Sequence, residues 1–424
     1  MIDLRLLREN PDLFRQASQN KRIPADIDAV LQTDSRLREL RVEVEELRGE
    51  RNRVSKSIGK LPPAEREAAL EEAKVLRERL AASEPELKEL EERLAALLLT
   101  VPNLPDPEVP VGASEEDNVE LRRWGTPREL GFEPKDHVDL ALSLDLADFQ
   151  RGSKVSGSRF YYLKNEGALL EMALVRWAIE FLWGRGLTPM IVPELVRDEA
   201  MTGTGFFPLG REDAYAIEKD GLYLVGTSEV PLVSFHMDEI LAKDELPKRY
   251  VGHSSCFRRE AGAAGKDTRG FYRVHQFHKV EQVVICENDP DVMRAEHEAL
   301  VANVEALLQA LELPHRVARA CTGELGMGQT LKTEIETWMP SRGAYSETHS
   351  CSTLGEFQAR RLNLRYRDAD DKLRFCGTLN NTALASPRIL IPILETYQQE
   401  DGTVVVPEVL RPYLPGIDVI RPKR

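Results

Sequence analysis

The 424-residue sequence is poor in cysteine and has no long apolar run, and each absence excludes a class of protein. No apolar run reaches the ~18 residues that a membrane-spanning helix needs, and the first residues form no apolar signal-peptide core. The five cysteines are odd in number and form no C-x-x-C pair, which indicates free thiols in a reducing compartment. We therefore expect a cytoplasmic protein that makes no contact with a membrane.

The sequence also lacks the glycine loops that cradle nucleotide phosphates, because neither GxxxxGK[ST] nor a GxGxxG before a helix occurs. Any bound nucleotide would have to be held by side chains on a sheet. A net charge of −14 argues against a protein that covers nucleic acid with its whole surface, although one locally basic element could still contact it. His253 and Cys256 have a metal-ligand spacing, but no second pair follows nearby, so we expect no zinc.

Residues 1 to about 110 have the sequence pattern of helices. We expect a short helix at residues 3–19, then two long helices joined by a Pro-containing turn at 59–63. Their apolar stripes are Leu37, Leu40, Val44, Leu47, Val54 and Ile58, then Leu70, Ala73, Leu76, Leu80, Leu87, Leu90, Leu94 and Leu97. This spacing predicts an antiparallel hairpin, which either reaches an extended partner or forms a dimerisation coiled coil. Pro85, between Ser83 and Glu86, is expected to kink or restart the second helix.

Four prolines at residues 102–110 predict a stiff linker, and hence domains at 1–110 and 111–424. The second domain mixes the two kinds of element. We expect helices at 167–184, 290–311 and 386–399 and strands at 190–193, 222–225, 282–286 and 362–367. Because turns or loops separate most strands, the fold class is α+β, with a helical hairpin followed by an antiparallel sheet flanked by helices.

The segment 256–281 is the most informative part of the sequence. It predicts a β-hairpin, closed by a polar Gly-rich loop that includes residues 267–270, which aims Arg258, Glu260 and Phe277 toward one sheet face together with Glu281. A guanidinium suits a phosphate, an aromatic ring suits a base, and a carboxylate suits an amine or a hydroxyl. The alternative is a surface hairpin with an Arg–Glu ion pair.

Three other segments offer similar groups. Residues 226–229 place a hydroxyl and a carboxylate at the end of a short strand, and residues 347–350 offer oxygen ligands that suit Mg²⁺. Residues 380–382 place an amide and a hydroxyl just before the last helix, which opens with Arg388. Taken singly, these segments could be a helix cap, a turn and an ordinary helix arginine.

With these motifs in view, the chain resembles the bacterial-type seryl-tRNA synthetases, a family of class II aminoacyl-tRNA synthetases, over nearly its whole length. The helical hairpin with the linker at 107–112 resembles the family's tRNA-binding arm. Residues 186–195, 256–281 and 380–388 resemble class II motifs 1, 2 and 3, and residues 226–232 resemble the serine-binding loop. The resemblance implies a homodimer that activates L-serine with ATP and Mg²⁺ and transfers it to tRNA(Ser), and also to tRNA(Sec).

The resemblance implies a role for each site residue. Arg258 and Arg388 would be catalytic, holding the α- and γ-phosphates. The serine pocket would consist of Thr227, Ser228, Glu229, Arg258, Glu281, Asn380 and Thr382. The ATP-binding residues would be Arg258, Arg259, Glu260, Val274, Phe277, Glu347, Thr348, His349, Ser350 and Arg388. Glu347 and Ser350 would hold Mg²⁺.

Three residues depart from the family's usual pattern. Ser228 stands where alanine is usual, His349 makes its loop more polar than Glu-x-Ser-Ser, and Pro85 is unusual in the arm. Prolyl- and threonyl-tRNA synthetases share the motifs, but they would need an anticodon-binding domain after Arg388, and too few residues follow it. Relatives that load carrier proteins lack the arm. A catalytically inactive paralogue that acts as a binding protein is the remaining alternative.

Overall fold

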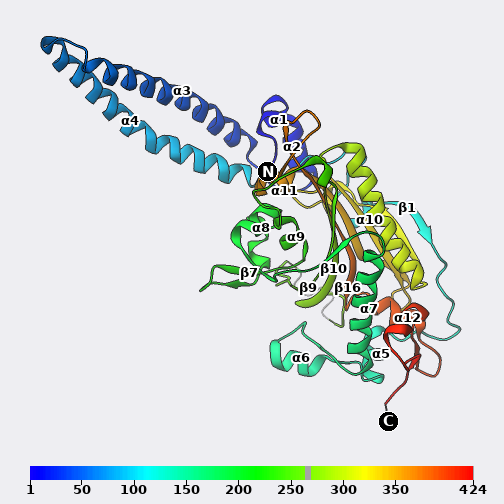
Figure 1. Ribbon diagram of the computed structural model, residues 1–424. Helices are drawn as coiled ribbons and strands as arrows, with labels where there is room; N and C mark the ends of the chain where they lie inside the picture. The colour runs from blue at the N-terminus through cyan, green and yellow to red at the C-terminus, as the bar shows by residue number, and fades with distance from the viewer. Residues whose placement is uncertain (263–268, 424) are drawn as a thin grey trace. The chain divides into compact units, whose positions relative to one another are not determined.

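The computed structural model describes residues 1–262 and 269–423, so residues 267 and 268 of the predicted loop lie outside the described residues. The chain forms two compact units, Ile2–Pro102 and Asn103–Arg424, with Met1 counted in the second (Figure 1). The limits of 1–110 and 111–424 stay a prediction. Within the described residues, no helix has the length and apolarity to cross a membrane.

The first unit is entirely helical. Helices α1 (Leu4–Glu9) and α2 (Pro11–Asn20) replace the single short helix that the sequence predicted at the N-terminus. The prediction was wrong because Pro11 has no N–H to continue a helix but fits the first position of a new one. Asp3 caps α1 by accepting a hydrogen bond from the backbone N–H of Arg5 at 2.8 Å.

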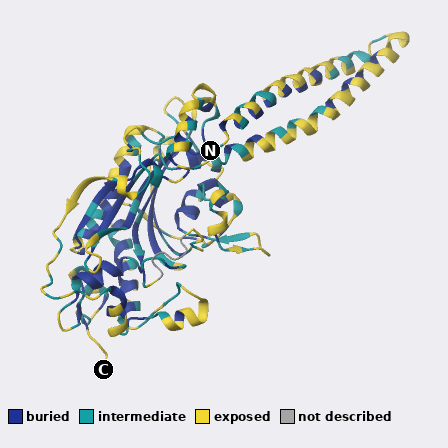
Figure 2. Ribbon diagram, turned by 180° about the vertical axis from the view of Figure 1, so that it is seen from behind, coloured by how far each residue is buried: buried dark blue, intermediate teal, exposed yellow. Residues whose placement is uncertain are grey.

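The predicted helical hairpin is confirmed as α3 (Ile27–Ile58) and α4 (Pro63–Leu98), which pack against each other. Figure 2 shows the buried stripe between exposed outer faces. The buried hairpin residues that the sequence predicted are Leu37, Leu40, Val44, Leu47, Ala73, Leu76, Leu80 and Leu94. The prediction that Leu70 is buried was wrong, since this residue is 54% exposed and its neighbour Ala69 is buried instead. Cross-helix ion pairs flank the stripe, including Arg41 to Glu91 at 2.7 Å.

Pro85 does not restart α4, which runs through it without interruption. The Ser83 hydroxyl donates to the carbonyl of Arg79 at 3.1 Å, one turn back, and so forms no capping box with Glu86. Pro85, which is exposed, has no backbone N–H and so leaves one hydrogen bond of the helix unmade.

The second unit is built on an eight-stranded sheet with the strand order β1-β11-β12-β13-β16-β10-β9-β4. Its strands are β1 (Val119–Trp124), β4 (Thr188–Ile191), β9 (Lys248–Phe257), β10 (Gln276–Cys286), β11 (His315–Arg319), β12 (Leu331–Met339), β13 (Ala344–Gly355) and β16 (Gly377–Ser386). All neighbours are antiparallel except β4, which runs parallel to β9. The predicted α+β fold with a largely antiparallel sheet is confirmed.

Helices cover this sheet, and alternate residues of β10 enter two different apolar clusters. Val280 and Val284 belong to the larger cluster, with α7 (Glu166–Trp183) and α10 (Pro290–Ala310). Val283 belongs to a second cluster on the other face. The remaining helices are α5 (His137–Ser143), α6 (Phe149–Ser156), α8 (Asp198–Thr204), α9 (Glu229–Ser234), α11 (Phe357–Leu362) and α12 (Leu390–Tyr397).

Short strands complete the unit. Two small sheets have two strands each: β2 (Ala147–Asp148) with β3 (Tyr162–Leu163), and β17 (Val404–Val405) with β18 (Val419–Ile420). Two others have three strands each. One contains β5 (Leu195–Arg197), β6 (Ala216–Ile217) and β7 (Leu222–Leu224), and the other contains β8 (Ile240–Leu241), β14 (Arg365–Arg367) and β15 (Leu373–Phe375).

The predicted order of elements near the end of the chain needs correction. Asn380 and Thr382 lie in the middle of β16, so the strand continues well past the segment predicted to precede the last helix. That helix, α12, begins at Leu390, after a turn at residues 387–389. Arg388 therefore lies in this turn and does not open the helix.

Candidate active site

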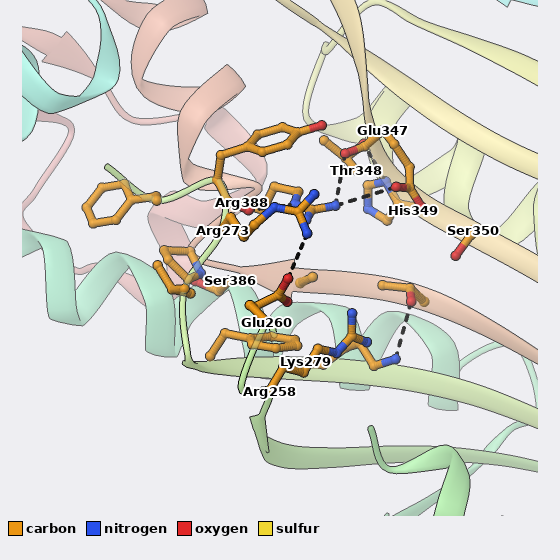
Figure 3. Close-up of a pocket in the computed structure, with 17 residues that line it drawn as sticks. Arg258, Glu260, Arg273, Lys279, Glu347, Thr348, His349, Ser350, Ser386 and Arg388 are labelled. Carbon is orange, nitrogen blue, oxygen red and sulfur yellow. Dashed lines mark hydrogen bonds and ion pairs between the residues drawn. The ribbon is translucent and has the colours of Figure 1, made fainter. Parts of the chain in front are cut away.

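Strands β10, β13 and β16 place polar side chains around one pocket of the second unit (Figure 3). Of the predicted site residues, the pocket is lined by Arg258, Glu260, Val274, Phe277, Glu347, Thr348, His349, Ser350, Thr382 and Arg388. Arg259 does not line the pocket; its backbone N–H donates to the carbonyl of Asp213 at 3.0 Å.

At one end of the pocket a carboxylate lies buried between a hydroxyl and an ammonium group. Glu281 is 1% exposed, and its Oε2 accepts hydrogen bonds from Lys279 Nζ at 2.6 Å and Thr382 Oγ1 at 3.2 Å. A bulge in β16 creates this arrangement, because Ala383 is an extra residue between the pairs Val280–Leu384 and Glu281–Thr382. Thr382 is thereby paired directly with Glu281.

A second carboxylate, Glu229, is buried in the first turn of α9. Its Oε1 accepts hydrogen bonds from Asn380 Nδ2 at 2.9 Å and Gln358 Nε2 at 2.7 Å. Burial raises the pKa of Glu229 to about 7; the charge of Glu281 adds to the rise, and that of Lys279 opposes it. Two buried carboxylates, Glu229 and Glu281, therefore stand beside the pocket, close to the ammonium group of Lys279 that lines it.

The hydroxyls at 227 and 228 are already engaged. Thr227 Oγ1 accepts a hydrogen bond from the Glu229 N–H at 3.1 Å, but the helix cap considered as an alternative does not form, since Ser228 is the N-cap of α9 and makes no side-chain capping bond. Ser228 Oγ donates to the carbonyl of Gly252 in β9 at 3.2 Å. The Thr227 hydroxyl thus bonds to the backbone of Glu229, just before the first turn of α9.

Arg258 lies just beyond β9, and its guanidinium stands 5.2 Å from the centre of the Phe277 ring. The Arg–Glu ion pair considered as an alternative does not form between Arg258 and Glu260, since Glu260 pairs with Arg273 at 2.7 Å. Glu260 has a positive φ of 53°, a conformation that only a tightly determined turn maintains in a non-glycine residue. The Arg258 guanidinium is thereby left beside an aromatic face in the pocket.

Arg388 lies across the pocket from Arg258 (Figure 3) and is held by the segment before β10 and by β13. Its Nε donates to the carbonyl of Tyr272 at 3.2 Å, and its Nη1 donates to the carbonyl of Glu347 at 3.3 Å. The Glu347 carboxylate stands 3.8 Å from the same Nη1. The Arg388 guanidinium also lies 4.5 Å from the centre of the Tyr272 ring. The pocket therefore places the guanidinium groups of Arg258 and Arg388 beside the aromatic rings of Phe277 and Tyr272.

The pair proposed for Mg²⁺ depends on a bulge in β13. Glu347 and Ser350 are three residues apart and would face opposite sides of a regular strand. Thr348 is an extra residue between the pairs Glu336–Glu347 and Ile335–His349, so both Glu347 and Ser350 line the pocket. One carboxylate and one hydroxyl suit Mg²⁺, which takes few protein ligands and completes its shell with phosphate and water.

His349, which departs from the family pattern, is buried and bonded to its neighbour. Its Nδ1 lies 2.8 Å from Thr348 Oγ1, and Thr348 Oγ1 also lies 2.6 Å from Thr337 Oγ1. Burial, together with the charges of His315 and Arg388, lowers the pKa of His349 to about 3. His349 is therefore a neutral group in the wall of the pocket, and it adds no charge beside Glu347.

Sequence reasoning missed four residues of the site, namely Lys279, Gln358, Arg273 and Tyr272. Lys279 had a signal, because it lies two residues before Glu281 on the same face of a strand. Gln358 had none, since it comes from α11 and reaches Glu229 from a distant part of the sequence. Arg273 lies 13 residues from its partner Glu260 in the sequence, so no local pattern indicates the pair.

Comparison with known proteins agrees with this geometry. Residues 1–105 match the model of the seryl-tRNA synthetase N-terminal domain, and residues 215–397 match that of the class II tRNA synthetase core domain (G, H, P, S and T). The serine–tRNA ligase of Deinococcus radiodurans is 50% identical over 420 residues, which is 99% of each chain. That of Thermobifida fusca is 48% identical and covers 100% of this chain and 99% of its own.

Solved structures agree as well. A seryl-tRNA synthetase from Pyrococcus horikoshii, complexed with ATP, superimposes with a TM-score of 0.92 at 41% identity, covering 100% of both chains. A cytoplasmic serine–tRNA ligase from Naegleria fowleri, in complex with AMP, gives a TM-score of 0.88 at 32% identity, covering 100% of this chain and 99% of its own. The chain thus belongs to the seryl-tRNA synthetase family of class II aminoacyl-tRNA synthetases.

Proposed function

We propose that this chain is a serine–tRNA ligase, which activates L-serine with ATP and then transfers the seryl group to the 3′ end of tRNA(Ser). The observation that carries the proposal is the junction of two small sites. The buried carboxylates Glu229 and Glu281 stand next to a pocket with Arg258 and Arg388, and Lys279 bonds Glu281 while lining that pocket. An amino acid and a nucleotide would meet at this junction.

The activation step brings two anions together, since the serine carboxylate attacks the α-phosphorus of ATP and pyrophosphate leaves. The nucleophile is already ionised, so no general base is needed. The task of the protein is to align the reactants and to neutralise charge that grows in the transition state. Arg258 would bridge the serine carboxylate and the α-phosphate, and Arg388 would hold the γ-phosphate. When bound, Mg²⁺ at Glu347 and Ser350 would supply further positive charge between phosphates.

Phe277 and Glu260 would recognise the adenine. The Phe277 ring would stack on the base, with Arg388 covering its other side. Glu260 would accept a hydrogen bond from the adenine amine, and its ion pair with Arg273 holds the carboxylate in place for that contact. Val274 would meet the nucleotide through its backbone.

Serine would be selected by its hydroxyl and its ammonium group. Glu281 and Thr382 offer polar partners to a hydroxyl in a buried space, and alanine would leave them unpaired. Glu229 and Asn380, with Thr227, would line the place of the ammonium group. Threonine carries the same hydroxyl and would have to be excluded by its extra methyl group.

The helical hairpin of α3 and α4 is the proposed site of tRNA binding, for tRNA(Ser) and also tRNA(Sec). Most of its large apolar residues pack between the two helices, and its outer faces are mainly charged, with Val42, Leu70 and Val75 exposed among them. That composition supports an arm that contacts a polar partner rather than a coiled coil that packs on a second one. We also propose a cytoplasmic location, since all five cysteines are free and buried.

A homodimer is proposed from an apolar surface beside the sheet edge. Met172 and Trp183 on α7 are 68% and 65% exposed, and Ile191 on β4 is 98% exposed. In the sheet, β4 is an edge strand that pairs with β9 alone. An edge with exposed apolar side chains favours pairing with another chain, and this segment corresponds to class II motif 1. The proposed partner is a second copy.

An inactive paralogue is not favoured. The arginines and carboxylates of the pocket are all in place, and relatives 48–50% identical over the whole chain are named serine–tRNA ligases. The prolyl-tRNA synthetase of Giardia lamblia shares the fold, with 16% identity and a TM-score of 0.57 over 65% of this chain.

The first prediction concerns activation. The protein should catalyse serine-dependent exchange of pyrophosphate into ATP, and Arg258→Ala should lower kcat/KM for this exchange by about 100-fold or more, because Arg258 faces the charge that develops at phosphorus. Arg367→Ala, at an exposed arginine of β14 outside the pocket, is the matched control and should change the rate by less than about threefold. Exchange with another amino acid in place of serine would refute the proposal.

The second prediction concerns the arm. Removing residues 42–90 and joining Arg41 to Glu91 by a short Gly/Ser linker should preserve exchange, since those two side chains already pair across the hairpin. Charging of tRNA(Ser) by this variant should fall by about 100-fold or more, because the contacts that the arm makes are lost. Full charging by a variant with normal exchange would show that the arm does not bind tRNA.

The third prediction concerns Glu229. A buried carboxyl with a raised pKa keeps its proton in the folded state after the unfolded chain has lost it, so its contribution to stability is present below pH 4.5 and is lost as pH rises to about 7. Glu229→Gln should remove this dependence. Without serine, the Tm of the wild type should fall relative to that of the variant between about pH 5 and about pH 8, as scanning calorimetry can measure. Parallel curves for the two proteins would contradict the raised pKa.

The fourth prediction concerns assembly. Ile191→Glu combined with Met172→Glu should convert the dimer to a monomer in sedimentation velocity, since each places a charge in the proposed apolar interface. Leu373→Glu, at a residue 45% exposed on β15, is the control and should leave the dimer intact. A wild-type protein that sediments as a monomer would refute the dimer.

A further inference from the structure

The first turn of α5 holds the segment that forms one wall of the nucleotide pocket. Arg269 donates hydrogen bonds to Asp136 at 2.8 Å and to Asp139 at 2.7 Å, and the Phe271 N–H donates to His137 Nε2 at 3.3 Å. Phe271 and the next three residues, 272–274, line the pocket. The described chain is thus fixed to α5 at the point where it becomes the pocket wall.

The hydrogen bonds of His137 define its tautomer. Because Phe271 donates an N–H, Nε2 must accept and carries no proton. The proton of the neutral ring is then on Nδ1, which lies 3.2 Å from Glu395 Oε1. The backbone N–H of His137 donates to the same oxygen at 3.0 Å. Glu395 therefore sets both the position of His137 and the direction of its acceptor.

Glu395 is 0% exposed and belongs to α12, which packs against α5 (Figure 1). It also holds the turn between β12 and β13, where Ser341 donates to it from its backbone N–H at 3.0 Å and from its hydroxyl at 2.8 Å. The neighbouring Arg342 guanidinium lies 4.2 Å from the ring centre of Tyr272. One buried carboxylate thus bonds to His137, which contacts Phe271, and to the turn whose Arg342 contacts Tyr272.

The pocket-wall segment packs so closely against α5 that no side chain fits at position 270, which is a glycine. This residue has a φ of 79°, and a Cβ there would lie 2.2 Å from His137 Nε2 and 2.6 Å from Val138 Cγ2. The Phe271 ring packs on His137, Phe149 and Tyr161, with ring centres 5.7, 5.1 and 5.4 Å apart. The contact between the wall segment and α5 is therefore close over consecutive residues.

We infer that Glu395 and His137 are positioning residues, which act through the Phe271 backbone to hold residues 272–274 as the wall of the nucleotide pocket. Neither residue lines the pocket. The inference rests on the proposed function, because the wall would face ATP and not serine. It follows that loss of the pair should weaken nucleotide binding while leaving the Glu229–Glu281 end of the site unaffected.

The test is a comparison of His137→Leu with His137→Gln in the full-length protein. His137→Leu removes both hydrogen bonds of the side chain, to Glu395 and to the Phe271 N–H. It should raise the KM for ATP in pyrophosphate exchange about tenfold, while the KM for serine changes by less than about twofold. His137→Gln retains a donor and an acceptor on one side chain and should recover much of the loss. Ser341→Ala removes one bond to Glu395 from the other side and should raise the KM for ATP by a few-fold.

A matched control comes from His236, which also lies between a carboxylate and a polar partner but outside the pocket. Its Nδ1 lies 2.6 Å from Glu239 Oε2, and its Nε2 lies 2.8 Å from the Tyr250 hydroxyl. His236→Leu should lower stability without a selective effect on the KM for ATP. Equal rises in both KM values, no rise in a folded His137→Leu variant, or a His137→Gln variant as impaired as His137→Leu would each overturn the inference.

Failure of the proposed function is distinguishable from failure of this inference. If the wild type lacked serine-dependent exchange, the proposed function would fail, and the wall would be tested by direct binding of AMP. Weaker AMP binding by His137→Leu than by the wild type and by His236→Leu would then support the positioning role. Equal AMP binding by the three proteins would refute it.

Discussion

The contact between Lys279 and Glu281, buried in the middle of the sheet, is the interaction on which the site depends. Moving two charges out of water costs several kcal/mol for each ion unless other groups complete their hydrogen bonds. Thr382 supplies one such bond to Glu281, at 3.2 Å. A second carboxylate, Glu229, lies close enough for the charge of Glu281 to raise its pKa. The surrounding strands and helices keep these groups apart from water and in fixed positions.

Two bulges make the required geometry possible in a sheet. A regular strand alternates its side chains, so that groups one or three residues apart cannot share a face. The extra residue Ala383 in β16 pairs Glu281 with Thr382, and the extra residue Thr348 in β13 brings Glu347 and Ser350 to one side. Both bulges border the pocket, and both redirect side chains that a regular strand would send to the opposite face.

The motifs could be predicted from the sequence because their chemistry is local. The helical hairpin followed from the spacing of its leucines, and the pairing of β9 with β10 followed from the alternation near residue 277. Errors arose where the answer depended on tertiary structure. Leu70 fits the helical period, but Ala69 lies closer to the facing helix. The strand around Asn380 was missed because polar residues in a buried strand resemble a loop.

Two residues that the sequence did not reveal lie far along the chain from the residues they bond. Gln358 reaches Glu229 from α11, and Glu395 reaches His137 from α12. Glutamine and glutamate at these positions look like ordinary helix residues, because nothing nearby in the sequence indicates what they bond. Their burial and their partners exist only once α11 and α12 have packed. Single-sequence reasoning therefore identifies residues that would touch substrate more readily than residues that hold those in place.

The charges at the buried end of the site have a consequence for the kind of substrate that fits. Two carboxylates, Glu229 and Glu281, share one ammonium group, Lys279, so this end has room for one more positive charge. A proton on Glu229 fills that role near neutral pH when no ligand is bound. An α-ammonium group would replace the proton and let Glu229 ionise, while Arg258 would receive the carboxylate of the same molecule. A zwitterionic amino acid satisfies both ends at once, whereas an amine or a carboxylic acid alone satisfies only one.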